Sequence, residues 1–462
     1  MDPIDTSRQL RKVKTNHRRI FTPLPVPGSE EVTEVLARYE PRSMAGHSPV
    51  IWDRAEGYQI FDPYGNIWID FSSAVVLANA GHAHEEICQA IKAQVDRKLL
   101  HNYIFPSEIR ARLVERLVAI SPESLEKVFL LTTGSEATEC AIKLTRMHGR
   151  TLGPEKIGIV SFTNSFHGRT MGSQMIGGYP DQKEWIGHLD PDMHQIPFPF
   201  CFKCPWGKAA YDRCGEECFQ KGMAQLSDQG IGPEQIAGFI SESFQGPSVA
   251  FMPEDYVQAM RRWADVHQAL VAFDEIQAGF GRSGKLFAYE HYGIEADLIC
   301  CGKGITGSLP LSAVLGRARI MDIPDHGEMS STHTGNPLCC AAALANLDVI
   351  EGEKLVERAA RLGRILSERL SHLKRKYPEP VGGIGGKGLA YAVYLVNPGT
   401  RELEVDMGDR VTELALQRGL FMLQTGRGTL KIAPPLSIPE DALLEGVDVI
   451  DEAMGACGRG EI

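Results

Sequence analysis

Short apolar runs of strand length alternate with stretches of helical spacing along most of the chain. Ala269–Phe273 and Ala296–Cys301 are two such runs, each too short for a helix and each followed by Gly-rich sequence. Gly158–Thr163 and Ile236–Glu242 have the same character, and Glu254–His267 has the spacing of a helix. The pattern predicts buried strands that alternate with helices in an open α/β sheet.

The same patterns predict the elements around this sheet. Lys127–Thr133 is a strand-like run, and a helical stretch follows it directly from Gly134 to Gly149. From Pro337 a long helical pattern continues to about Tyr377. The other predicted elements are two strands around the turn at 62–66, helices at Glu85–Lys98 and Glu108–Ile120, and strands at Leu311–Leu315, Leu389–Val396 and Leu430–Ala433.

A carboxylate and an amine stand at the ends of the first two strands. Asp274 follows Ala269–Phe273, and Lys303 follows Ala296–Cys301 after one glycine. Ligands of an open α/β sheet bind outside the carboxyl ends of its strands, so the two side chains can meet the same bound molecule. The sequence therefore predicts a cofactor site at this edge of the sheet.

A second feature of the predicted site is the start of the helix at Gly134. The free N–H groups and the positive dipole end of a helix favour an anion, and glycine permits its close approach. Gly134 and Ser135 are therefore candidates for an anion site. The plainer interpretation of the two residues is an ordinary capped helix.

The run DEIQAGFGRSGK at 274–285, together with CGKG at 301–304, closely resembles the cofactor site of class III (omega-type) aminotransferases, which use pyridoxal 5'-phosphate (PLP). The resemblance extends over nearly the whole chain and includes 4-aminobutyrate/ornithine-type members and amino-sugar aminotransferases of aminoglycoside biosynthesis. It implies that Lys303 forms the Schiff base with the cofactor aldehyde. It also implies that Asp274 keeps the pyridine nitrogen protonated, which makes the ring an electron sink.

The resemblance assigns further cofactor contacts to residues of the strand ends and loops. Gln277 is expected to donate a hydrogen bond to the ring oxygen, and Ile276 and Phe166 are expected to cover opposite ring faces. Thr332 is expected to reach the phosphate of the neighbouring subunit's cofactor, which implies a homodimer with a shared site. The full predicted set is Gly134, Ser135, Phe166, His167, Asp274, Ile276, Gln277, Lys303 and Thr332.

Substrate residues are predicted from the same resemblance. Arg169 matches the arginine that holds a substrate carboxylate in 4-aminobutyrate-type members, and Glu242 matches the acid that can cover a second arginine. That second arginine belongs to an R-I-x-x-P-L segment, where this chain has Lys431. An ammonium is a point charge, whereas a guanidinium forms two parallel bonds to a carboxylate. Arg427 is the alternative holder of a carboxylate.

Composition limits the remaining classes of function. With 462 residues, 43% of them hydrophobic and 23% charged, the chain is expected to be soluble and globular. A formal net charge of -11 argues against nucleic acid as the main partner. No apolar run reaches the about 18 residues of a membrane span, and residues 1–20 form a basic arm without the apolar segment of a secretory signal.

The cysteines suggest a reducing compartment, because their number, 11, is odd and several lie in apolar runs. Cytoplasmic localisation is therefore expected. Cys201, Cys204, Cys214 and Cys218 form a separate cluster within 198–219. Four thiolates at such spacing can hold a structural zinc, while free thiols in a loop are the alternative. No metal is predicted at the cofactor site.

The predicted fold is a fold-type I PLP-dependent transferase. Residues 1–75 are assigned to an N-terminal arm and part of a small domain, 76–336 to the large PLP-binding domain, and 337–462 to the C-terminal small domain. The predicted reaction is ping-pong transfer of an amino group from a primary amine, such as an ω-amino compound or amino sugar, to an oxo acceptor.

Several alternatives to this reaction stay open. Within the family they are an amino-sugar 6'-aminotransferase of aminoglycoside biosynthesis, a 4-aminobutyrate-type enzyme that uses 2-oxoglutarate, and a racemase or epimerase. A PLP-binding regulatory protein without turnover is the alternative from a different class. Such a protein would need a fused DNA-binding module, and the sequence shows none.

Overall fold

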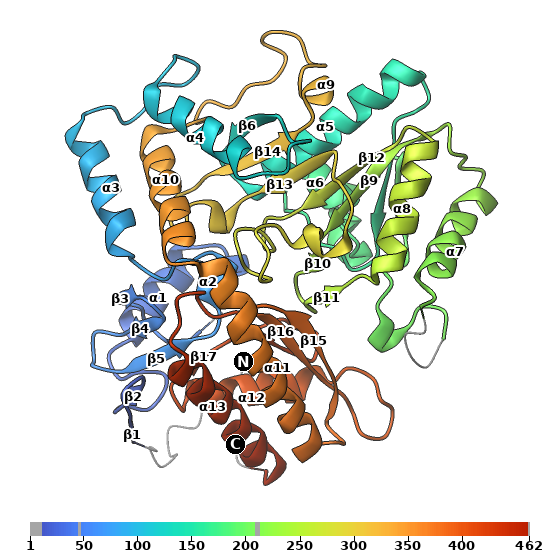
Figure 1. The fold of residues 1–462 in the computed structure, drawn as a ribbon. Helices are drawn as coiled ribbons and strands as arrows, with labels where there is room; N and C mark the ends of the chain where they lie inside the picture. Colours follow the sequence, from blue (N-terminus) through green and yellow to red (C-terminus); the bar gives the residue numbers. More distant parts are fainter. Residues whose placement is uncertain (1–11, 45–47, 208–212, 461–462) are drawn as a thin grey trace.

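A seven-stranded sheet forms the centre of the larger part of the molecule (Figure 1). The structure is a computed structural model that describes residues 12–44, 48–207 and 213–460, so most of the predicted basic arm lies outside the described residues. The strand order is β6 (Lys127–Leu131), β14 (Ser312–Gly316), β13 (Leu298–Cys301), β12 (Leu270–Asp274), β9 (Ile236–Glu242), β7 (Gly158–Phe162) and β8 (Met193–Ile196). Only β14 runs against its neighbours β13 and β6. The predicted mostly parallel sheet is confirmed.

Both faces of this sheet are covered by helices. Leu270 and Ala272 of β12 pack into the apolar cluster under α5 (Gly134–Leu152), while Val271 and Phe273 pack on the opposite face, where α8 (Glu254–Val266) lies. Alternate side chains of a strand point to opposite faces, so a strand buried on both sides has to be apolar throughout. The helix α7 (Gly215–Asp228) packs outside α8.

The predicted long helix from Pro337 to Tyr377 is wrong, because two helices replace it. The helix α10 (Pro337–Gly352) packs on α3 (Glu85–Asp96) and α4 (Glu108–Ala119), and α11 (Leu355–Lys376) packs on α13 (Glu440–Gly458). Lys354 between them has a φ of 52°, which turns the chain out of the helical path. Gly352 and the charged residues after it are the signal for this helix end.

The smaller part of the molecule combines segments from both ends of the chain. Its first sheet contains β1 (Val13–Lys14), β2 (Arg19–Ile20), β5 (Ile67–Asp70), β4 (Gln59–Phe61) and β3 (Arg54–Glu56), and β17 (Leu420–Phe421) pairs in parallel with β5. Its second sheet contains β15 (Val381–Lys387), β16 (Ala390–Leu395), β19 (Thr429–Ile432) and β18 (Leu423–Gln424). The domain boundaries at residues 75 and 336 stay a prediction.

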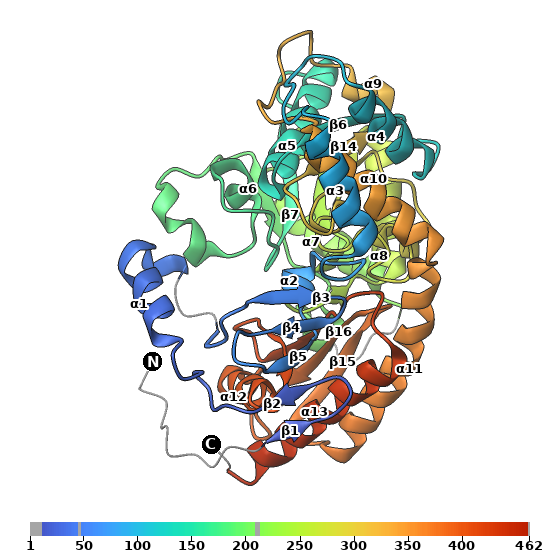
Figure 2. The same ribbon diagram turned by 90° about the vertical axis from the view of Figure 1, so that its left-hand side faces the viewer.

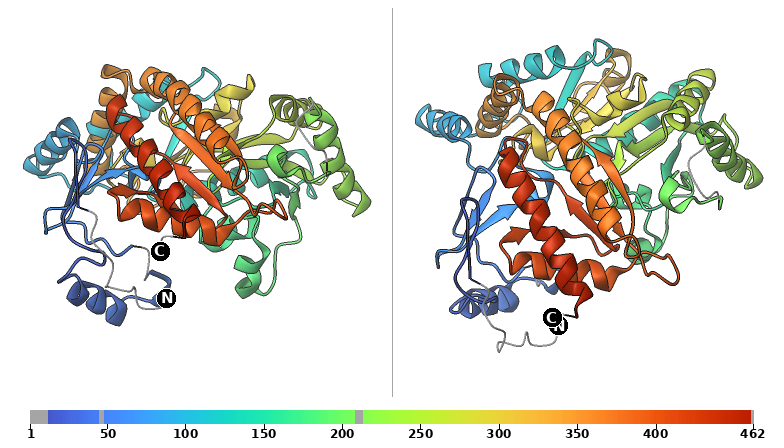
Figure 3. Two further views of the ribbon diagram at one scale, coloured as in Figure 1. Left: turned by 90° about the horizontal axis from the view of Figure 1, so that it is seen from below. Right: turned by 60° about the horizontal axis from the view of Figure 1, so that its bottom comes forward.

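Helices complete this smaller part. Figure 3 shows α11 and α13 side by side over the C-terminal strands, with α12 (Val405–Leu416) beside them. Figure 2 shows α1 (Glu30–Tyr39) at the edge of the molecule, and none of its side chains is buried. The short elements are α2 (Ser73–Val76), α6 (Met171–Ile176), α9 (Ala318–Met321), β10 (Phe244–Gln245) and β11 (Ala250–Phe251).

One buried arginine joins the two parts. Arg282, in the loop after β12, is fully buried, and its Nη1 donates to the backbone oxygens of Leu389 and Pro434 in the C-terminal region. Its Nη2 donates to Asn79 Oδ1 at 2.7 Å, so the same guanidinium also holds the segment after α2. Burial lowers the pKa of Arg282 to about 9, and the charge of Asp70 opposes this shift.

We expect Arg282→Met to lower the free energy of unfolding by roughly 2–4 kcal/mol, because buried oxygens lose their donor. Urea denaturation followed by circular dichroism measures this change. Arg375→Met is the control, since Arg375 is exposed on α11 and its loss should change stability by no more than about 0.5 kcal/mol. Equal stability of the two variants would show that Arg282 does not hold the two parts together.

Candidate active site

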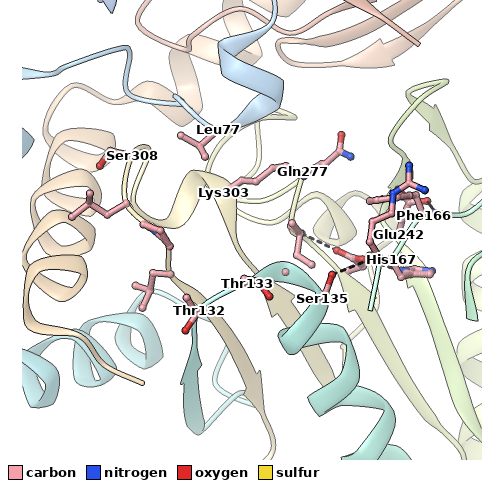
Figure 4. A pocket seen from close by; sticks show the side chains of 18 of the residues that line it. Leu77, Thr132, Thr133, Ser135, Phe166, His167, Glu242, Gln277, Lys303 and Ser308 are labelled. Atoms are coloured by element: carbon pink, nitrogen blue, oxygen red, sulfur yellow. Dashed lines mark hydrogen bonds and ion pairs between the residues drawn. The ribbon is translucent and has the colours of Figure 1, made fainter. Parts of the chain in front are cut away.

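A cavity of ≈ 360 Å³ lies at the carboxyl ends of the central strands (Figure 4). Asp274 ends β12 and is paired in register with Glu242, which ends β9, so both carboxylates reach the same edge. Most predicted site residues share this cavity: Gly134, Ser135, Phe166, His167, Arg169, Glu242, Asp274, Ile276, Gln277 and Lys303 line it. Thr332 and Lys431 are not among the lining residues.

Asp274 is held at two points. Its Oδ2 accepts a hydrogen bond from His167 Nδ1 at 2.8 Å, and its Oδ1 accepts one from the backbone N–H of Ile276 at 3.0 Å. Burial alone lowers the pKa of His167. The hydrogen bond to Asp274 and the negative charge of that carboxylate outweigh burial, so the pKa of His167 is raised. His167 therefore fixes the orientation of the Asp274 carboxylate.

Lys303 follows β13 and opens a single helical turn, Lys303–Ile305. Its φ of 41° is unusual for a residue with a side chain. Backbone angles of this kind are often found at functional sites. Burial lowers the pKa of Lys303, while the charges of Asp274 and Glu242 raise it by less. A lowered pKa brings the amine closer to its neutral, nucleophilic form.

The start of α5 fits a phosphate. Thr133 and Glu136 form a capping box, in which Thr133 Oγ1 accepts from Glu136 N–H at 3.3 Å and Glu136 Oε2 accepts from Thr133 N–H at 2.7 Å. In the described part of the chain, the backbone N–H groups of Gly134 and Ser135 keep no partner. A Cβ at residue 134 would lie 2.9 Å from Ile276 Cδ1. Glycine at this position therefore leaves the space that the Ile276 side chain occupies.

Glu242 is buried under the cavity and bound by the backbone. Its Oε1 accepts from Gly246 N–H at 2.9 Å, and its Oε2 accepts from Phe166 N–H at 3.0 Å. Burial raises its pKa to about 7, the positive charge of His167 lowers it, and the charge of Asp274 adds to the rise. At neutral pH the carboxyl is therefore partly protonated, which limits repulsion between the two acids.

The two predicted arginines differ in their relation to the cavity, because only Arg169 lines it. Arg169 is exposed at the cavity, with its Nη1 donating to Gln182 Oε1 at 3.1 Å and its guanidinium carbon 5.3 Å from the centre of the Phe166 ring. Arg427 lies outside the cavity lining, 4.1 Å above the ring of Tyr179.

Lys431 is buried beyond the lining. Its side chain is 4% exposed, and its Nζ donates to the Gly246 oxygen at 2.8 Å and to Gln277 Oε1 at 2.7 Å. Burial and the charge of Lys303 lower its pKa to about 7. The structure thus places Lys431 against a cofactor-binding candidate, Gln277, and outside the surface that a substrate would meet.

The four clustered cysteines line a separate cavity of ≈ 20 Å³ with Trp206, whose Nε1 donates to Cys218 Sγ at 3.0 Å. All four are free thiols. Within the described ranges, no group of three or more His, Cys, Asp or Glu side chains is arranged to hold a metal ion, so the zinc alternative receives no support.

Sequence reasoning missed part of the cavity lining. Thr133 had a visible signal, because T-x-x-E before a helix is a capping box. Leu77 and the segment 308–311 carry no motif and meet the site only through the fold. Thr332 is exposed on the loop before α10, and its predicted contact with a neighbouring subunit stays a proposal.

The polar groups of this cavity fit PLP. A fixed carboxylate suits the ring nitrogen, two free N–H groups at a helix start suit the phosphate, and an amine of lowered pKa suits the aldehyde. An α/β sheet with these groups at one edge defines a PLP-dependent enzyme of fold type I.

Comparisons with known proteins give the family. The model of the family "Aminotransferase class-III" matches residues 42–454. A leucine/methionine racemase of Thermococcus litoralis is 34% identical over 94% of this chain and 97% of its own, and a 4-aminobutyrate aminotransferase of Mycobacterium leprae is 32% identical over 95% and 98%. The crystal structure of an amine transaminase from an uncultivated Pseudomonas species, in its PLP-bound form, has a TM-score of 0.83 at 30% identity, covering 91% of this chain and 97% of that one.

The chain therefore belongs to the class-III aminotransferases, and it is an enzyme that uses PLP. This confirms the predicted family, fold and cofactor. Across the described residues, no helix combines the length and apolar character of a membrane span.

We expect Lys303→Ala to abolish turnover and the covalent attachment of PLP, because the amine that binds the aldehyde is lost. Borohydride reduction followed by peptide mass spectrometry should find the cofactor on the Lys303 peptide of the wild type and on no peptide of the variant. Lys285→Ala, an exposed lysine of the same segment, is the control and should keep the label. A labelled lysine elsewhere in Lys303→Ala would overturn the assignment.

Asp274→Asn should keep PLP bound but lower kcat by roughly 10²–10⁴-fold, since a neutral amide cannot keep the ring nitrogen protonated. Steady-state kinetics and the PLP content of the purified protein measure the two effects. Asp297→Asn serves as a control for loss of a buried carboxylate, because Asp297 is 3% exposed and lies outside the cavity lining. A nearly unchanged kcat in Asp274→Asn would mean that Asp274 is structural.

Proposed function

We propose that the enzyme transfers an amino group by a ping-pong mechanism from a primary amine without an α-carboxylate to an oxo acceptor. An ω-amino compound or an amino sugar is such a donor. The observation that carries the proposal is the state of Lys431, which replaces the expected arginine. Its amine is bound to Gly246 and Gln277, so it offers no two-pronged contact to an α-carboxylate.

The residues of the cavity supply the remaining functions. PLP, when bound, provides the electron sink for bond cleavage at the substrate carbon. The Lys303 amine takes a proton from that substrate carbon and delivers it to the cofactor carbon. Its lowered pKa suits a base at neutral pH. Asp274, oriented by His167, would hold the protonated ring nitrogen of the cofactor.

Arg169 supports a substrate with a distant carboxylate. In the described part of the chain it provides the only guanidinium of the cavity lining. A carboxylate bound there leaves the other end of the molecule free to place an amine at Lys303. This favours a 4-aminobutyrate-type donor among the ω-amino compounds, while an amino sugar would leave Arg169 in solvent.

Racemisation is the second candidate, and the similarity to the racemase of Thermococcus litoralis favours it. Lys303 serves both reactions, because each removes a proton from the carbon next to the nitrogen. A single turnover without acceptor separates them: a transaminase releases one oxo product per site and leaves the cofactor aminated, whereas a racemase returns the substrate with inverted configuration. A panel of terminal amines, amino sugars and α-amino acids in this assay tests the proposal.

We also propose a homodimer with a site shared between subunits. Thr332 is exposed on the loop before α10, as its expected contact with a partner's cofactor requires. Ile104 and Phe105, between α3 and α4, are 57% and 69% exposed, and another subunit that covered them would remove both apolar side chains from water.

We expect Lys431→Arg to raise kcat/KM for glutamate by about tenfold, because a guanidinium reaches further and bonds a carboxylate with two parallel hydrogen bonds. The value for the preferred amine should change by less than about twofold, and the two half-reactions measured side by side provide the internal control. If the wild type already uses glutamate as its best donor and the substitution changes neither value, the carboxylate is held elsewhere.

A further inference from the structure

The side chain of Lys431 has two hydrogen-bond partners, and one of them lines the active-site cavity. It lies on β19, where its Nζ is 2.8 Å from the Gly246 oxygen and 2.7 Å from Gln277 Oε1. Gln277 lines the cavity, whereas Lys431 does not. Among the described residues, the hydrogen bonds of the lysine side chain therefore link it to the site through the glutamine and the backbone after β9.

These contacts occupy one end of the Gln277 amide and leave the other end available. The amine has at least two N–H donors in either protonation state, which is enough for both oxygens. With Oε1 bound to Lys431, the Nε2 group is left over, and within the described residues it has no hydrogen-bond partner. A Cβ at residue 246 would lie 2.6 Å from Nε2, so glycine at this position leaves the space that the amide occupies.

The surroundings of Lys431 differ from those of a lysine that binds a substrate carboxylate. The charged groups around it are Lys303, Arg282 and Glu242. Two of these are cations, and both Glu242 oxygens already accept from the backbone N–H groups of Gly246 and Phe166. A buried amine with no ion pair and two neutral oxygen partners orients other groups more readily than it binds an anion.

We propose that Lys431 is a positioning residue for cofactor binding. It holds Oε1 of the Gln277 amide, which would leave the Nε2 N–H donors available to the ring oxygen of PLP when PLP is bound, and it makes no direct contact with the substrate. Because PLP binds before any amine enters, this role is independent of whether the enzyme transfers amino groups or racemises amino acids.

The test is a double-mutant cycle on PLP affinity, measured by titration of the apoenzyme with PLP in the absence of substrate. Lys431→Met and Gln277→Ala should each raise the Kd for PLP about tenfold, and the double variant should also show about a tenfold rise, since both remove the same hydrogen bond. Lys156→Met is the control: Lys156 is 6% exposed and its Nζ donates to the Pro233 oxygen at 2.9 Å, away from the cavity. Its Kd should equal that of the wild type.

Two further readouts separate positioning from a structural or substrate role. Lys431→Arg keeps donors for both oxygens, so it should retain the Kd for PLP within about twofold. The visible absorption maximum of bound PLP should shift alike in Lys431→Met and Gln277→Ala. Losses of affinity that multiply to about a hundredfold in the double variant, or an unchanged Kd in Lys431→Met, would overturn the proposal. If Lys431→Met does not fold, Lys431→Leu, which also removes the donor, takes its place in the cycle.

Discussion

The arrangement of the site depends on keeping a negative charge at the buried end of β12. Asp274 is 5% exposed and stands beside Glu242, the end of the next strand, in direct register. Two ionised carboxylates this close repel one another unless the surroundings separate their proton affinities. Here the imidazole of His167 stabilises one of them, and burial makes the other easier to protonate. Asp274 therefore presents its carboxylate to the cavity beside a second carboxyl group whose pKa is raised.

The two buried lysines of this region show how partners decide the role of a side chain. Both have a pKa lowered by burial. In the described structure Lys303 has no hydrogen-bond acceptor and faces the cavity, so its nitrogen is free to react. Lys431 has two acceptors and lies outside the cavity lining, so its nitrogen holds other groups in place.

The sequence predicted those parts of the site that short segments determine. Asp274 and Lys303 follow apolar strands, and strand ends meet at one edge of a parallel sheet, so their proximity could be inferred. The contacts of Lys431 could not, because its partners lie 154 and 185 residues away and depend on how the C-terminal sheet docks. The break at Lys354 was missed for a different reason: helical spacing continues on both sides of it, and the signal at Gly352 is weak beside that spacing.

The pairing of β17 with β5 has a consequence for how the chain folds during synthesis. Leu420 lies opposite Ile69, so this N-terminal sheet receives a strand that leaves the ribosome some 351 residues after its partner, the difference between the two numbers. The central sheet needs only residues 127 to 316 and can assemble earlier. During that interval Ile69 and Asp70 of β5 lack the partner that β17 provides, and exposed strand edges are places where chains associate wrongly. A truncation that removes the C-terminal segment would therefore leave this N-terminal edge open to aggregation.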